Sequence, residues 1–193
     1  AVQARWQAQT WGTRPEQFPC LVVGSYVRQP AEMLFSQQNW DACFSDPEHA
    51  QRMTPRLRDR SRVYDALLRM WQIDDEQGIA CLSHSDPHVG NTFIDAHGVP
   101  GFLDWQSASL APAMDDVAYF LVGAMTVAGR RQHERALVDG YLAVLERELG
   151  QGLDRQAMWL DYQRHCLHGL VWTVVPPQLQ PEGYRALMTE RYV

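Results

Sequence analysis

The strongest constraint on the fold is the spacing of apolar residues in the C-terminal half of the chain, which repeats with the period of an α-helix. One apolar stripe covers residues 136–149 and ends at Gly150, a residue typical of helix C-termini. A second helix is predicted over residues 154–174, because two prolines follow it, and another is expected from about Pro181. Residues 54–73, which precede this half of the chain, show the same helical spacing of apolar residues. The chain is therefore predicted to be mainly α-helical.

Between these helices lies a shorter region with the pattern of a β-hairpin. Residues 91–95 and 99–104 are predicted to form two strands, joined by a tight turn in which Gly98 supplies a positive φ. If the turn has two residues, Asn91 lies opposite Asp104, on the same face of the hairpin. The expected fold class is thus mainly α with a small β-hairpin.

The organisation of the chain follows from where these patterns are clear. Residues 54–193 are predicted to form one helical lobe, which contains a polar loop and the hairpin at residues 83–105. Residues 1–53 have little periodicity and are left as a poorly defined segment leading into the lobe, with a short strand at residues 20–23.

Composition excludes several classes of function. The 193 residues are 46% hydrophobic and 21% charged, as in ordinary globular proteins, and the formal net charge is -6. Such a chain lacks the basic surface that generic binding to nucleic acid or to an anionic membrane requires. It has no apolar run approaching a membrane span, no basic segment leading into an apolar run at its N-terminus, and no Cys-x-x-Cys pair. We expect a cytoplasmic protein, and the sequence leaves its oligomeric state open.

The residues suited to chemistry are concentrated in residues 83–105, where Asp86, Asn91 and Asp104 follow one another along the chain. Two oxygen ligands beside a free carboxylate suit a hard cation such as Mg²⁺, which keeps coordination positions for phosphate and water. Asp86 then remains as a candidate base. His88 has two interpretations, as a structural loop residue or as a contact to phosphate or substrate.

This pattern resembles the catalytic segment of the aminoglycoside phosphotransferase and choline kinase-like enzymes, a phosphotransferase family with a protein-kinase-like fold. The residues that carry the resemblance are His84-Ser85-Asp86, Asn91 and Asp104-Trp105. The resemblance implies that the chain is the C-terminal lobe of such a fold. It also implies transfer of the γ-phosphoryl group of ATP to the hydroxyl of a small molecule, with Mg²⁺ as cofactor.

The resemblance further implies a role for each site residue. Asp86 accepts the proton of the substrate hydroxyl, while Asn91 and Asp104 hold Mg²⁺. His84 braces the loop, and Asp116, at the start of a predicted helix, anchors it. The implied partners are a nucleotide and a small hydroxyl-bearing substrate, whose identity the sequence leaves open.

The chain also departs from this family. Ser85 stands where glycine is usual, and Gln106 stands where an acidic residue is common. Enzymes of this kind bind the ATP phosphates with a lysine and a glycine-containing loop on an N-terminal lobe. Here all 17 basic residues are arginine, and there is no G-x-G-x-x-G loop. We therefore expect the ATP-binding lobe to lie outside this chain, and we expect these residues alone not to transfer phosphate.

Two other functions stay open. The missing lysine is also expected of a catalytically silent pseudokinase or scaffold. A metal-dependent hydrolase would use a His-x-Asp-x-His motif and a further carboxylate, namely His84, Asp86, His88 and Asp104. That interpretation leaves Asn91 unexplained. His165 and His168 suggest a metal site but have no third ligand nearby in sequence, and Asp161 or Glu134 could receive a cationic substrate.

Overall fold

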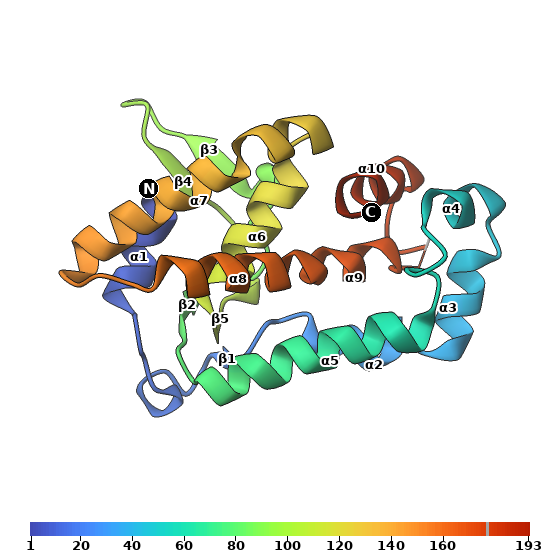
Figure 1. The fold of residues 1–193 in the computed structure, drawn as a ribbon, viewed down its shortest axis with the longest axis horizontal. Helices are drawn as coiled ribbons and strands as arrows, with labels where there is room; N and C mark the ends of the chain where they lie inside the picture. Colours follow the sequence, from blue (N-terminus) through green and yellow to red (C-terminus); the bar gives the residue numbers. More distant parts are fainter. Residues whose placement is uncertain (177) are drawn as a thin grey trace.

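The described residues, 1–176 and 178–193 of this computed structural model, form helices around two small β-sheets (Figure 1). The α-helices are α1 (Val2–Gln9), α2 (Arg28–Leu34), α3 (Gln37–Phe44), α4 (Pro47–Arg52), α5 (Arg60–Gln77), α6 (Ala113–Ala124), α7 (Val127–Leu149), α8 (Arg155–His165), α9 (Leu170–Thr173) and α10 (Glu182–Tyr192). The strands are β1 (Val22–Val23), β2 (Cys81–Ser83), β3 (Thr92–Ile94), β4 (Pro100–Phe102) and β5 (Ser109–Ala111). Short 3₁₀ helices are η1 (Pro15–Gln17), η2 (Val89–Asn91), η3 (Trp105–Ser107) and η4 (Cys166–Gly169). The predicted helical character is confirmed, and the structure adds a three-stranded sheet to the expected hairpin.

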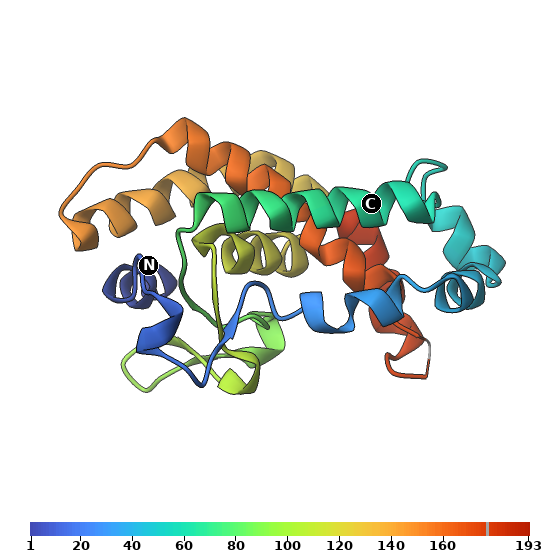
Figure 2. The ribbon, with the colours of Figure 1, turned by 90° about the horizontal axis from the view of Figure 1, so that it is seen from below.

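Two groups of buried apolar side chains hold the helices together. The first joins α5 to α2, α3 and α9, and includes Phe35, Leu67 and Val171. The second joins α1 to α6, α7 and α8, and includes Met114 and Leu142. In Figures 1 and 2, α8 and α9 follow one another along the length of the molecule beside α5. This run of helix therefore connects the two groups.

Helix α5 begins and ends later than the apolar spacing predicts. It begins after Asp59, whose side chain caps it, and not at Thr54. It continues past residue 73 to Gln77 and ends at Gly78, which adopts φ 64°. The acidic residues of its last turn do not break the helix, because Asp74 is paired with Arg28 of α2. The start of α5 was thus misplaced because Asp59 caps it, and its end was misplaced because of the long-range ion pair between Arg28 and Asp74.

The C-terminal helices follow the predicted order with one interruption. Helix α7 ends at Gly150, which has φ 68°, as predicted. The single helix expected over residues 154–174 is divided into α8, η4 and α9. Gly169 in η4 lies directly against the ring of Tyr192, where a Cβ atom would overlap the ring. This glycine therefore allows α10 to pack closely on η4.

The three-stranded sheet brings the N-terminal segment next to the polar loop. Its order is β1-β5-β2, with β1 parallel and β2 antiparallel to β5. Ser109 of β5 lies opposite both Val22 and Ser83. Residues 1–53, which the sequence left undefined, thus contribute β1 to the sheet and α1 to the core.

Within the described part of the chain, no helix has the length and apolar character needed to cross a membrane.

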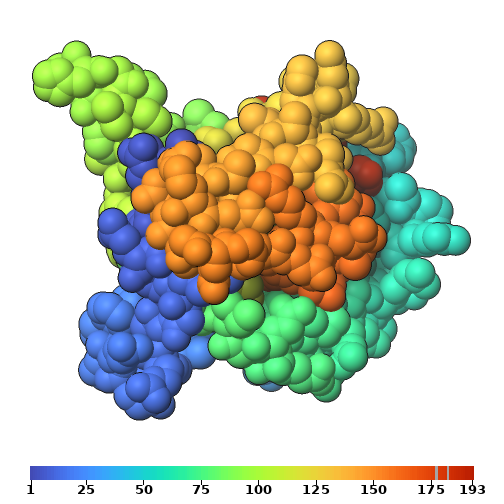
Figure 3. Space-filling view, turned by 60° about the vertical axis from the view of Figure 1, so that its left-hand side comes forward, coloured from blue at the N-terminus to red at the C-terminus, as the bar shows by residue number. Residues whose placement is uncertain are grey.

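Strands β3 and β4 form the expected hairpin, but with a longer turn. The N–H of Asp95 donates to the carbonyl of Val99 at 2.9 Å, so the turn spans the three residues between them. Gly98 has φ 76°, as predicted. The carboxylate of Asp95 accepts hydrogen bonds from the N–H groups of His97 and Val99, both at 2.8 Å, and this closes the longer turn. In Figure 3 the hairpin stands out from the body of the molecule.

The three-residue turn changes the register of the hairpin. The N–H of Leu103 donates to the carbonyl of Asn91 at 2.8 Å, so Asn91 lies opposite Leu103 and not opposite Asp104. The prediction of a direct pair between Asn91 and Asp104 was wrong, because it assumed a two-residue turn. Asp104 instead follows the strand in a left-handed conformation, with φ 60°.

Candidate active site

The loop between β2 and β3 is held by one buried carboxylate. Asp116, in the first turn of α6, is 1% exposed. Its two oxygens accept hydrogen bonds from the Ser83 hydroxyl at 2.7 Å and from the N–H groups of His84 and Ser85 at 2.7 and 2.9 Å. Burial raises the pKa of Asp116, and the hydrogen bond from Ser83 opposes that rise. The carboxylate thereby fixes the backbone of the first two loop residues and the side chain of Ser83 at the end of β2.

Ser85 lies in the left-handed region, with φ 66°, a conformation that glycine adopts more readily than serine. This conformation costs a non-glycine residue about 1–2 kcal/mol. The Ser85 hydroxyl shares a 2.7 Å hydrogen bond with the hydroxyl of Ser109 and lies 3.2 Å from that of Ser83. These buried hydrogen bonds offset part of the strain that a serine introduces.

His84 lies between the loop and the hairpin and is fully buried. Its Nε2–H donates to the carbonyl of Leu103 at 2.7 Å, and its Nδ1 accepts from the N–H of Asp86 at 3.3 Å. The partners of the two nitrogens place the ring proton on Nε2. The ring also packs 4.7 Å from that of Trp105. His84 therefore connects the backbone of Asp86 to the backbone that carries Asp104.

The carboxylate of Asp86 lies at the surface of a cleft, with 28% of its side chain exposed. Its Oδ1 accepts from the hydroxyl of Tyr119 at 3.0 Å, and its Oδ2 accepts from Nδ2 of Asn91 at 3.3 Å. Burial and the nearby Asp86 raise the pKa of Tyr119, which remains a donor. His88 lies with Nε2 3.7 Å from Asp86 Oδ2, while its Nδ1 accepts from the N–H of Gly90 at 3.0 Å.

Asn91 and Asp104 each keep an oxygen that no described residue uses. Asn91 is 9% exposed, and its Nδ2 also donates to the backbone carbonyl of Asp86 at 3.0 Å. Its Oδ1 accepts no hydrogen bond from the described residues, and neither does the exposed carboxylate of Asp104. An amide oxygen and a carboxylate are donors that Mg²⁺ prefers, so the two residues fit this ion. The hydrogen bond from the N–H of Leu103 to the carbonyl of Asn91 joins the two backbone segments that carry these residues.

The sequence reasoning did not assign a role to Tyr119, although a signal for it was present. Tyr119 lies three positions after Asp116 on α6, so the two side chains share one face of the helix. A helix that anchors the loop through Asp116 therefore also presents Tyr119 to it. This spacing could have identified Tyr119 as a partner of Asp86.

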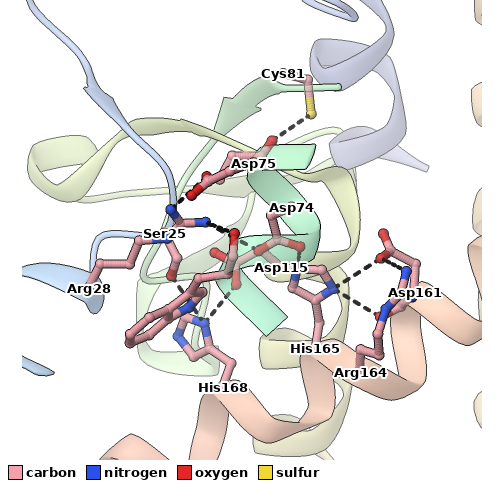
Figure 4. Close-up of polar contacts among 12 residues, drawn as sticks. Ser25, Arg28, Asp74, Asp75, Cys81, Asp115, Asp161, Arg164, His165 and His168 are labelled. Carbon is pink, nitrogen blue, oxygen red and sulfur yellow. Dashed lines mark hydrogen bonds and ion pairs between the residues drawn. The ribbon is translucent and has the colours of Figure 1, made fainter. Parts of the chain in front are cut away.

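His165 and His168 belong to two separate buried contacts (Figure 4). The Nδ1–H of His168 donates to Asp115 at 2.7 Å. His165 lies between two elements: its Nδ1–H donates to the carbonyl of Asp161 at 2.9 Å, and its Nε2 is 3.4 Å from Asp74. The two histidines therefore share no ligand in the described structure.

Asp74, Asp161 and His165 offer ligand atoms within 4.8 Å of one another, a cluster that excludes His168 and that the sequence did not reveal because Asp74 lies on α5. Both carboxylates, however, are paired with arginines, Asp74 with Arg28 at 3.4 Å and Asp161 with Arg164 at 2.7 Å. The nearby cations balance the acidic charge. An ion-pair network accounts for this cluster without a metal.

The fold and the loop together define a class of protein: a mostly helical structure that carries an aspartate, an asparagine and a second aspartate around one hairpin, as phosphotransferases of the protein-kinase type do. A family model described as the Phosphotransferase enzyme family matches residues 26–159. This chain belongs to that family. The matched residues include the loop, the hairpin and Asp116, and they begin in the N-terminal segment. Searches of curated proteins and of solved structures found no match to the chain.

Proposed function

We propose that this protein is an ATP-dependent phosphotransferase that transfers a γ-phosphoryl group to the hydroxyl of a small molecule. The observation that carries the proposal is the setting of Asp86. Tyr119 and Asn91 each donate a hydrogen bond to one of its carboxylate oxygens, and Asp86 lines a pocket. Nearby along the chain, Asn91 and Asp104 keep side-chain oxygens that accept no hydrogen bond from the described residues. Family membership supports the reaction class.

In the proposed mechanism, Asp86 orients the acceptor hydroxyl and takes its proton. Tyr119 and Asn91 hold the two carboxylate oxygens in place, so the carboxylate does not have to reorganise during the reaction. Asn91 and Asp104 would hold Mg²⁺, which supplies charge compensation to the phosphate oxygens when it is bound. His88 lines the same pocket and would contact the phosphate or the acceptor.

We place the ATP-binding lobe outside these 193 residues. The proposal rests on the absence of any lysine and of a G-x-G-x-x-G loop from the sequence, since both serve the ATP phosphates in related enzymes. The coding sequence upstream of Ala1 should therefore encode a lobe with a lysine and a glycine-containing turn. By the same reasoning, the isolated chain should not bind Mg-ATP at submicromolar concentration in isothermal titration.

The absent lysine also supports a second candidate, a catalytically silent pseudokinase. A metal-dependent hydrolase has less support. Both ring nitrogens of His84 are engaged with backbone groups of Asp86 and Leu103, and the ring is fully buried, so it is not available as a metal ligand.

The test compares phosphoryl transfer from ATP by the whole gene product and by its Asp104→Ala, Asp86→Ala and Asp65→Ala variants. Asp65 is an exposed aspartate on α5 whose side chain makes no hydrogen bond or ion pair with the described residues, so its variant is the matched control. We expect Asp86→Ala to lose about 10²- to 10⁴-fold in kcat, and Asp104→Ala to lose more. Thermal melting should be unchanged in Asp104→Ala and Asp65→Ala, whose side chains are exposed, and lower in Asp86→Ala, which leaves the buried hydroxyl of Tyr119 without its acceptor.

Two outcomes would contradict the proposal. An Asp104→Ala variant that keeps more than about a tenth of kcat, a barrier change under about 1.4 kcal/mol, would remove Asp104 from the metal site. A whole gene product with a complete ATP lobe and no Mg²⁺-dependent transfer to any hydroxyl compound would favour the pseudokinase.

A further inference from the structure

A cavity of about 270 Å³ opens beside Asp86 and His88. Its walls include three aromatic side chains, Tyr119, Trp172 and Tyr184, and one amide, Gln180. These residues come from the polar loop, from α6, from α9, from the segment that leads into α10 and from α10 itself. Because Asp86 is the proposed base, a molecule in this cavity would have its hydroxyl next to that base. The inference below therefore rests on the proposed function.

The charge of the cavity limits what can occupy it. Among the lining residues whose side chains the structure describes, Asp86 is the only carboxylate, and none is an arginine. The two acidic residues considered for a cationic substrate are engaged elsewhere. Asp161 is buried and paired with Arg164, and Glu134 is paired with Arg130. The described walls thus offer neither the several carboxylates that a polycation needs nor a guanidinium or ammonium group for an anionic substrate.

The aromatic residues favour a flat apolar surface on the ligand. The ring of Tyr119 already stacks on that of Trp172, with centroids 5.6 Å apart and planes 14° apart, and on that of His168, with centroids 5.1 Å apart. The remaining aromatic surfaces of the wall are the rings of Trp172 and of Tyr184, which comes from α10. Ring faces of this kind pack against the apolar face of another ring.

Gln180 supplies a second, independent observation. It is 6% exposed, and within the described structure neither its Oε1 nor its Nε2 has a hydrogen-bond partner. The indole N–H of Trp172 is also buried without a partner among the described residues. Buried polar groups are normally paired, so these atoms indicate a ligand that both donates and accepts hydrogen bonds. Hydroxyl groups do both.

We propose that the phosphate acceptor is an uncharged, polyhydroxylated ring of the sugar type, which packs on the aromatic side chains and pairs with Gln180. The cavity has the volume of about nine waters in the liquid, which suits a single ring.

The experiment measures binding by isothermal titration to three methyl glycosides that share one ring. They are methyl glucoside, which is neutral, the methyl glycoside of glucosamine, which is cationic, and methyl glucuronide, which is anionic. The neutral probe should bind at least tenfold more tightly than either charged probe. Gln180→Leu should weaken binding of the neutral probe at least tenfold. The matched control is Gln178→Leu, because Gln178 is exposed on the same segment and does not line the cavity. That variant should leave the affinity unchanged.

The inference is overturned if the neutral probe does not bind, if a charged probe binds as tightly, or if Gln180→Leu has the affinity of the wild type. Binding needs no phosphoryl transfer, so the two proposals fail separately. Asp104→Ala should retain the neutral preference while it loses transfer. A protein that prefers the neutral ring but transfers no phosphate would contradict the proposed function alone, whereas transfer to a charged acceptor would contradict this inference alone.

Discussion

The buried histidine His165 should make the protein less stable as the pH rises through the neutral range. Its side chain is fully buried and contacts Asp161 of its own helix and Asp74 of α5. Burial by itself lowers the pKa of His165. The carboxylates of Asp74, Asp115 and Asp161, which face it from α5, α6 and α8, outweigh burial and raise the pKa to about 9.

The size and sign of the effect follow from this shift. A histidine in the unfolded chain has a pKa of about 6.5. Because the folded value lies above the unfolded one, the contribution to stability is complete below about pH 6.5 and is lost as the pH rises through about 9. The whole shift corresponds to about 3 kcal/mol, of which about 2 kcal/mol should be lost between pH 6 and pH 8.

The assay is urea-induced unfolding at pH 6, 7 and 8, with free energies from linear extrapolation. It compares the wild type with His165→Gln, which cannot bind a proton, and with His133→Gln, a control at an exposed position of α7. The window stops at pH 8 because buried thiols such as Cys81, whose pKa is raised, affect stability at higher pH. The wild type and His133→Gln should lose about 2 kcal/mol more than His165→Gln does. Equal slopes in the wild type and His165→Gln would refute the reasoning.

Two further substitutions test the loop. Asp116→Ala should lower the free energy of unfolding by at least about 3 kcal/mol in urea titrations, because it leaves three donors of the loop unpaired in a buried site. A loss no greater than that of the exposed control Asp65→Ala would contradict this. Ser85→Gly removes both the left-handed strain and the hydrogen bond to Ser109, so the opposing effects should leave the unfolding free energy within about 1 kcal/mol of the wild type. A Ser85→Gly loss above about 2 kcal/mol would mean that the hydroxyl network dominates.

Local signals in the sequence predicted the helices well and their ends less well. The apolar stripe before Gly150 predicted the end of α7, because a glycine with positive φ acts locally. The start of α5 was misplaced, since both Thr54 and Asp59 are residue types that cap helices. Its extension to Gln77 depends on Arg28, which is far away in the sequence and gives no local signal.

In the candidate site, too, local signals predicted the elements better than their exact geometry. The strand patterns of residues 91–95 and 99–104 and the glycine at position 98 predicted the hairpin, but the predicted turn length was wrong. The extra residue is stabilised by the side chain of Asp95, and a choice between two close turn types depends on that single contact. The amide of Gln180, which has no hydrogen-bond partner among the described residues, could not be predicted at all, because a lack of partners is a property of the packed structure.

The first turn of α6 connects the loop to the buried histidines, because its two consecutive aspartates point to different partners. Asp116 holds the loop, and Asp115 accepts from His168 in η4. The ring of His168 stacks on that of Tyr119, with centroids 5.1 Å apart, and Tyr119 donates to Asp86. A change in the packing of η4 would therefore reach Asp86 by two routes, through the position of α6 and through the ring of Tyr119. Since both routes pass through buried groups with few alternative partners, the position of the proposed base depends on the C-terminal helices as much as on its own loop.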